Sequence, residues 1–190
     1  IMILENFNFK DQVIIVTGAS GQIGSKIVNA LVDLNSKVIA VDQQMSSLRE
    51  KAKKYSWNEE DVYILNCDIS DSKQVERTIT RSVERFKSIS SLVNNAGVSV
   101  FEPYLSRKEK SIDWVMNVNI KGTLLFTKEF LNYKKINSSE GSIVNVASHY
   151  GLISPDPRIY KDGDRKNSEI YGATKAGIIQ MTKYYAVHAS

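Results

Sequence analysis

A tyrosine and a lysine, Tyr171 and Lys175, stand four residues apart in the segment YGATK. On a helix this spacing places both side chains on one face. A helix is expected from about Ile170, with Ser168 as its N-cap residue. An ordinary tyrosine is protonated at neutral pH, so proton exchange there requires its phenolate to be stabilised by about 4 kcal/mol. A lysine ammonium about 4 Å away supplies a similar amount at an effective dielectric constant of about 20. The pair therefore either performs acid/base chemistry or is a chance pair on a helix.

A second group of residues has the pattern of a phosphate-binding turn. The stretch TGASGQIG (17–24) places glycines at 18, 21 and 24 between an apolar run and a helical pattern. Glycines there permit a tight turn and close approach of the backbone to a pyrophosphate, and the helix start offers unpaired N–H groups. The sequence predicts dinucleotide binding here, with an ordinary loop as the alternative. The residues expected to contact the cofactor in this turn are Gly18, Ser20, Gly21, Gln22 and Ile23.

Two aspartates follow later apolar runs. Asp42 comes 24 residues after Gly18, near the offset of about 20 at which an acid meets the ribose 2'-hydroxyl. Its carboxylate would repel a 2'-phosphate, and no arginine follows before Arg49, so NAD is favoured over NADP. The alternative is a surface turn aspartate. Asp68 and Ile69 follow the third apolar run and are expected near the adenine, although Asp68 could be a turn residue.

The elements that position these residues alternate between strand and helix. Short continuous apolar runs, separated by segments long enough for a helix, indicate a doubly wound, Rossmann-type α/β fold with a parallel sheet. Five strands are expected, at Val13–Val16, Val38–Val41, Val62–Leu65, Leu92–Val93 and Ile143–Val146. We predict a single dinucleotide-binding domain over residues 1–190.

Two helical segments have apolar stripes. The first stripe is formed by Ile23, Ile27, Ala30, Leu31 and Leu34, and the second by Ile112, Val115, Met116, Phe126 and Phe130. Asn119 interrupts the second stripe, where an unpaired buried amide would cost a few kcal/mol. Asn119 is therefore expected to form hydrogen bonds, for structure or for function.

Two irregular segments, Ser99–Ser111 and His149–Ser168, follow the fourth and fifth expected strands. Ligands of open α/β sheets bind at the carboxyl ends of the strands, so both segments are expected to shape a site.

Composition excludes several classes of protein. The net charge is +4, from 25 basic and 21 acidic residues that are mixed along the chain, so nucleic-acid binding is not expected. Apolar runs fall far short of a membrane span, and the first ten residues, with Glu5 and Lys10, do not resemble a secretory signal. Cys67 is the single cysteine, which fits a reducing compartment, and the cytoplasm is expected. Neither His149 nor His188 has metal-ligand spacing, so no metal is predicted.

The chain resembles the short-chain dehydrogenase/reductase family. The resemblance rests on TGASGQIG (17–24), NNAG (94–97), NVNIKG (117–122), Ser148 and YGATK (171–175), in the family's order and over nearly the whole chain. It implies that Tyr171 exchanges a proton with the substrate oxygen, Lys175 favours the phenolate and holds the nicotinamide ribose beside Tyr171, and Ser148 hydrogen-bonds the substrate oxygen. It further implies that Asn119 stabilises a helix irregularity and a proton-relaying water. Asn95, Ala96 and Gly97 would support the cofactor.

The sequence departs from the family's pattern at three places. The glycine spacing resembles that of the extended subfamily, with Gln22 where the classical one has a glycine. Ser148 and Tyr171 are 23 residues apart, about ten more than is usual in the family, so an inserted loop over 149–168 is expected beside the substrate. The sequence stops at Ser190, where family members continue, so further strands are expected beyond it; without them the fifth strand would leave an apolar edge exposed.

The inserted loop is a candidate for substrate contact through His149 and Arg158. Its cations Arg158, Lys161, Arg165 and Lys166 could attract an anionic substrate, although Asp156, Asp162, Asp164 and Glu169 offset them and favour a solvated loop. The segment HYGLISPDPRIY resembles bacterial oxidoreductases of surface-sugar biosynthesis.

The sequence thus predicts an NAD-dependent oxidoreductase acting on a small alcohol or ketone, with a sugar derivative as one possible substrate. A sugar-nucleotide epimerase or dehydratase that retains NAD is one alternative, and a cofactor-sensing protein without catalysis is another. The family resemblance implies a homodimer or homotetramer.

Overall fold

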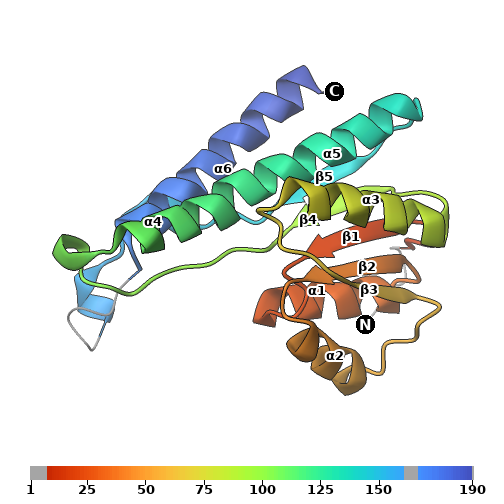
Figure 1. Cartoon of the computed structure of the whole chain (residues 1–190), viewed down its shortest axis with the longest axis horizontal. Helices are drawn as coiled ribbons and strands as arrows, with labels where there is room; N and C mark the ends of the chain where they lie inside the picture. The colour runs from red at the N-terminus through yellow and green to blue at the C-terminus, as the bar shows by residue number, and fades with distance from the viewer. Residues whose placement is uncertain (1–7, 161–166, 190) are drawn as a thin grey trace. The chain divides into compact units, whose positions relative to one another are not determined.

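A computed structural model describes residues 8–160 and 167–189 of the chain (Figure 1). Its five strands form one sheet in the order β3-β2-β1-β4-β5. Pairing is parallel between β1 and β2, between β1 and β4 and between β2 and β3. The predicted doubly wound parallel sheet is therefore confirmed. The strands are β1 (Val13–Thr17), β2 (Lys37–Asp42), β3 (Val62–Asn66), β4 (Ser91–Asn94) and β5 (Ser142–Asn145).

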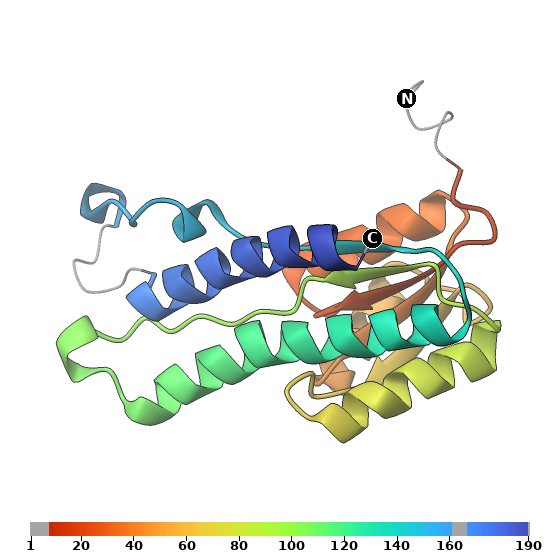
Figure 2. The ribbon, with the colours of Figure 1, turned by 90° about the horizontal axis from the view of Figure 1, so that it is seen from above.

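Helices connect the strands. The α-helices are α1 (Gln22–Asp33), α2 (Met45–Lys54), α3 (Ser72–Phe86), α4 (Glu109–Met116), α5 (Thr123–Ile136) and α6 (Glu169–His188). Short 3-10 turns occur at η2 (Tyr104–Ser106), η4 (His149–Gly151) and η5 (Pro157–Ile159). A π-helix, η3 (Asn117–Gly122), links α4 to α5. Figure 2 shows α1 and α3 on opposite sides of the strands, as a doubly wound fold requires.

Contacts divide the chain into two compact units. The first comprises Ile1–Ala96 and Leu125–Val144, and the second comprises Gly97–Leu124 and Asn145–Ser190. In the first unit every residue of β1 is buried, and so are the four central residues of β2. Continuous rather than alternating burial is the pattern of strands covered on both faces, which explains why these runs could be recognised in the sequence.

The predicted stripe on α1 is wrong in part. The buried residues of α1 are Gly24, Ser25 and Val28, whereas Ile23 is 61% exposed. Gly24 sets this orientation because it packs directly against the Gly18 carbonyl, so the helix turns a small-residue face inward.

The stripe along α4 and α5 also differs from the prediction. Val115, Phe126 and Phe130 are buried as expected, but Ile112 and Met116 are 37% and 41% exposed. Apolar side chains on a surface helix often stay in contact with solvent, so residue type alone does not identify the buried face. The buried residues of α4 are Ser111 and Val115.

Within the described parts of the chain, the helices are too short or too polar to cross a membrane.

Candidate active site

The glycines of the turn in the first unit allow main chain to lie close against main chain. Gly18 has a φ of +66°, and a Cβ there would lie 2.7 Å from the Cα of Ala96. A Cβ on Gly24 would collide with the Gly18 carbonyl. Gly21 is the N-cap of α1 and no side chain caps this helix. Its first N–H groups are thus available to an anion, as a pyrophosphate-binding helix requires.

Thr17 and Asn95 fix the shape of this turn. The Asn95 Nδ2 donates to the main-chain oxygens of Thr17 at 2.9 Å and Gly18 at 3.2 Å. The Thr17 hydroxyl accepts from the backbone N–H groups of Asn95 and Ala96, both at 3.1 Å. The segment after β4 therefore supports the glycine turn, as the sequence suggested.

Asp42 ends β2, as predicted, and binds the glycine turn. Its Oδ2 accepts from the Ser20 backbone N–H at 3.0 Å and from the Ser20 hydroxyl at 2.8 Å. Its Oδ1 accepts from the Gln44 N–H at 2.9 Å. A carboxylate has about four acceptor positions, so Asp42 retains capacity for a ribose hydroxyl. Together with the amino end of α1, which no described side chain caps, these residues fit a dinucleotide.

Asp68 lies in a turn after β3. Its Oδ1 accepts from the backbone N–H of Ser70 at 2.9 Å and from the Ser70 hydroxyl at 2.8 Å. The following Ile69 is buried. The turn role considered for Asp68 is therefore present, and adenine contact by Asp68 and Ile69 stays a prediction.

Helix α6 of the second unit carries Tyr171 and Lys175. Ser168 is its N-cap, as predicted, and accepts from the Tyr171 N–H at 3.2 Å. Lys175 is only 4% exposed, and its ammonium donates to the Val146 carbonyl at 2.7 Å. The Nζ lies 5.6 Å from the centre of the Tyr171 ring. Burial lowers the pKa of Lys175, because a low-polarity environment disfavours the charged form.

Asn119 lies in the π-helix η3 and is fully buried. Its Oδ1 accepts from the Val98 N–H at 2.8 Å, and its Nδ2 donates to the Val98 carbonyl at 2.9 Å and to the Thr174 hydroxyl at 3.0 Å. The expected helix irregularity is present, and the side chain joins the segment after β4 to α6. A relay water bound by Asn119 stays a prediction.

Ser148 caps the short turn η4, and its hydroxyl oxygen accepts from the Tyr150 N–H at 3.2 Å. Two glycines bring η4 against α6. A Cβ on Gly151 would lie 2.8 Å from the Ala176 nitrogen, and one on Gly172 would lie 2.9 Å from the Tyr150 carbonyl. Main-chain contact therefore fixes Ser148 relative to the helix that carries Tyr171.

The inserted segment has two local clusters among its described residues. The hydroxyls of Tyr150 and Tyr160 are 2.8 Å apart, and the His149 ring lies 4.2 Å from that of Tyr150. The Arg158 side chain is 88% exposed and pairs with Asp156 at 2.6 Å. Five other charged residues of the inserted segment lie outside the described residues: Lys161, Asp162, Asp164, Arg165 and Lys166.

Sequence reasoning missed an ion pair in the second unit. Arg107 donates through Nε and Nη2 to the two carboxylate oxygens of Glu169, at 2.7 and 2.9 Å. Glu169 is the first residue of α6, and its side chain is 60% exposed, as expected of a solvated acid, but its pairing with Arg107 was not foreseen. Local pattern gives no signal for this pair, since its members are 62 residues apart.

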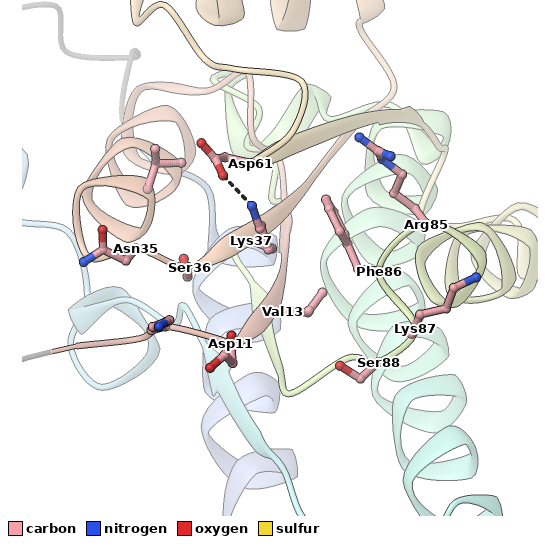
Figure 3. Close-up of a pocket in the computed structure, with 12 residues that line it drawn as sticks. Asp11, Val13, Asn35, Ser36, Lys37, Asp61, Arg85, Phe86, Lys87 and Ser88 are labelled. Atoms are coloured by element: carbon pink, nitrogen blue, oxygen red, sulfur yellow. Dashed lines mark hydrogen bonds and ion pairs between the residues drawn. The ribbon is translucent and has the colours of Figure 1, made fainter.

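A cavity of about 650 Å³ lies away from these residues (Figure 3). It borders Val13 and Lys37, which begin β1 and β2, and Lys37 pairs there with Asp61 at 2.6 Å. Ligands of such sheets bind at the carboxyl ends of the strands, so this cavity is not part of the candidate site. In the described residues, His, Cys, Asp and Glu do not gather in threes that could hold a metal.

The fold and the glycine turn define an α/β protein of the dinucleotide-binding type. Residues 12–190 match the short chain dehydrogenase family, and the chain belongs to it.

Relatives of the chain act on different substrates. The chain is 34% identical over 178 residues to a 3-oxoacyl-(acyl-carrier-protein) reductase of Thermotoga maritima, covering 92% of this chain and 67% of the relative. It is 29% identical to sorbitol-6-phosphate 2-dehydrogenase of Klebsiella pneumoniae, over 94% of this chain and 64% of the relative. The chain thus spans about two thirds of these relatives.

The structure is similar to that of a short chain dehydrogenase from Leptospira borgpetersenii with bound NAD+. The TM-score is 0.85 at 32% identity, over 98% of this chain and 68% of that one.

Proposed function

We propose that the protein is an NAD-dependent oxidoreductase that moves a hydride between nicotinamide and an alcohol or ketone, with Tyr171 as proton donor and acceptor. The observation that carries this proposal is the buried ammonium of Lys175, four residues from Tyr171 on α6 and 5.6 Å from its ring centre. A buried cation beside a phenol is costly in a purely structural role, and it favours a phenolate. Family membership and the NAD+ bound to the Leptospira relative support the cofactor.

Residues of the first unit would hold the dinucleotide. The open N-terminus of α1, with Gly18, Gly21 and Gly24 keeping side chains out of the way, suits the pyrophosphate. Asp42 would accept from a ribose hydroxyl and repel a 2'-phosphate, which favours NAD over NADP. When bound, the nicotinamide ring supplies or accepts the hydride.

Residues of the second unit would handle the proton. Lys175 has three donor hydrogens and uses one on Val146, so two remain for Tyr171 and a ribose hydroxyl. The Ser148 oxygen already accepts from the Tyr150 N–H. The Ser148 hydroxyl hydrogen is therefore free to donate to the substrate oxygen and to hold it beside Tyr171.

The substrate we propose is a small polyol or sugar derivative. The sorbitol-6-phosphate relative and the family's reductases act on compounds with an alcohol or ketone group, and His149 lies directly after Ser148 in the chain. An anionic substrate bound by Arg158 would have to displace Asp156 from the guanidinium. The cytoplasmic location and the homodimer or homotetramer suggested by the sequence remain proposals.

Turnover tests the proton transfer. The full-length protein is assayed with NAD and a panel of polyols and secondary alcohols, following NADH absorbance. Tyr171→Phe is expected to lower kcat at least 100-fold, the usual contribution of a general acid/base. Tyr184→Phe, which removes an exposed phenol from the same helix, is the control. An unchanged kcat in Tyr171→Phe would refute the assigned role.

Calorimetric titration with NAD and with NADP tests the cofactor. NAD is expected to bind more tightly than NADP, because Asp42 faces the 2'-position in the proposal. If neither NAD nor NADP binds, the proposal would have to be replaced by that of a protein that keeps the fold without this chemistry. NAD binding without net NADH formation, during turnover of a sugar nucleotide, would instead identify an epimerase or dehydratase.

A further inference from the structure

Arg107 is a buried cation in the segment between η2 and α4. Its side chain is only 3% exposed. Two of its nitrogens donate to both oxygens of Glu169, the first residue of α6. The third, Nη1, is buried, has no hydrogen-bond partner among the described residues and lies 3.9 Å from Glu102. The planar guanidinium matches a carboxylate in this forked arrangement, which defines direction as well as distance.

Glu102 extends the network to the beginning of α4. Its Oε1 accepts from the Ser111 hydroxyl at 2.8 Å, and its Oε2 accepts from the Lys108 N–H at 3.4 Å. Lys108 is the N-cap of α4, and Ser111 lies in its first turn. Arg107 therefore stands between the amino ends of α4 and α6, with a carboxylate on each side.

A second connection joins the same helical pair further along. Asn119, in the π-helix that continues α4, donates to the Thr174 hydroxyl at 3.0 Å. The two connections meet α6 at Glu169 and at Thr174. Tyr171 lies between them in the chain, two residues after the first and three residues before the second.

Stability alone is a weak explanation for this arrangement. Removing a guanidinium from water is costly, and a well-packed apolar group often serves as well. The unsatisfied Nη1 adds to that cost. The forked contact with Glu169 holds the amino end of α6 in a defined position. Tyr171 follows Glu169 by two residues in the chain.

We propose that Arg107 is a positioning residue, which fixes the first turn of α6 through Glu169 so that the Tyr171 hydroxyl has one orientation. This inference rests on the proposed function, because it assigns the purpose of the contact to Tyr171. Small displacements of a catalytic group reduce turnover strongly, by about 100-fold for about 1 Å.

Two variants of Arg107 and one control test the proposal in the full-length protein. Arg107→Ala is expected to lower kcat roughly 10- to 100-fold per folded molecule with KM changed less than about threefold. Arg107→Lys should recover only part of kcat, since an ammonium cannot make the forked contact. Arg85→Ala removes an exposed arginine that donates to the Glu59 carbonyl, and it should leave kcat unchanged.

Hydrogen exchange of the amides of residues 172–175 gives a readout that is independent of turnover. Exchange there should accelerate in Arg107→Ala and stay as in the wild type in Arg85→Ala. Faster exchange together with lower kcat supports the proposal. Unchanged exchange, or faster exchange with the wild-type kcat, overturns it. If the wild type itself oxidises no alcohol in the panel, the proposed function fails, whereas exchange still shows whether Arg107 fixes the helix end.

Discussion

Lys175 combines burial with a positive charge. Its side chain is almost fully buried, and its ammonium donates a hydrogen bond to the Val146 carbonyl, which is neutral. Burial without a carboxylate partner lowers the pKa of this lysine from the ordinary 10.5. A lysine poised in this way can take up and release a proton beside Tyr171 more readily than a surface lysine.

The lowered pKa predicts how stability changes with pH. Between the folded-state pKa of Lys175 and 10.5, the unfolded chain binds more protons than the folded one, so stability rises with pH in that window. Below the folded-state pKa the burial penalty is complete. We expect the free energy of unfolding of the wild type to rise relative to that of Lys175→Met as pH increases from 7 to 10.

Urea unfolding at several pH values, followed by circular dichroism, measures this difference. Lys183→Met, which removes an exposed lysine from the same helix, controls for the loss of one positive charge. Parallel stability curves for the wild type and Lys175→Met would show that the lysine titrates alike in both states.

Residues that belong to one short motif could be placed on the correct helix or strand from the sequence alone. Tyr171 and Lys175 share a helix and Asp42 ends a strand, because spacing along one element fixes such relations. Arg107 and Glu169 could not be paired, since tertiary structure brings them together across 62 residues. The turn formed by Asp68 and Ser70 was foreseen only as an alternative, because turn chemistry and ligand contact use the same residue types.

At the scale of elements, the close packing of η4 against α6 depends on two glycines. Gly151 and Gly172 allow main chain to lie against main chain, so Ser148 at the start of η4 is fixed against the helix of Tyr171. A backbone atom in such a contact cannot move aside as the end of a flexible side chain can. The contact therefore determines where the Ser148 hydroxyl lies.

Gly151→Ala tests this dependence. Its new Cβ would meet the backbone of Lys175 and Ala176, so η4 must shift. We expect kcat to fall about tenfold or more, with NAD affinity measured by calorimetry unchanged. Gly177→Ala is a matched control on α6, because its Cβ would meet only the movable end of the Ile120 side chain. Equal kcat in both variants would mean that η4 tolerates the displacement.

The positions of the strands were predicted more accurately than the buried faces of the helices. The apolar runs identified every strand to within one residue at each end. Burial on both faces explains this for β1 and the centre of β2, whereas β5 is partly exposed. Before Asn119, Val115 was placed correctly, but Ile112 and Met116 were expected to be buried and are not. Apolar type alone put Ile112 and Met116 in the stripe, yet both are more than a third exposed, because a surface helix can leave apolar side chains in contact with solvent.

At the scale of the whole chain, the two compact units do not resemble independent domains. The chain passes between them after Ala96, after Leu124 and after Val144. The second passage lies inside α5 and the third lies inside β5. Domain boundaries normally fall in exposed linkers that few contacts cross. Boundaries inside a helix and a strand support the proposal of one domain over residues 1–190.

A single domain should unfold in one transition that includes both units. Each unit contains a residue that can report its unfolding. Cys67 of the first unit is the only cysteine, and burial raises the pKa of its thiol to about 11, so its reaction with a thiol reagent reports unfolding there. Trp114 of the second unit, made the only tryptophan by Trp57→Phe, reports by fluorescence. We expect thiol reactivity and fluorescence to change at the same urea concentration, because interrupting α5 and β5 between the units would break their backbone hydrogen bonding. Two separate midpoints would show instead that the units unfold independently, and the single domain would then have to be replaced by two.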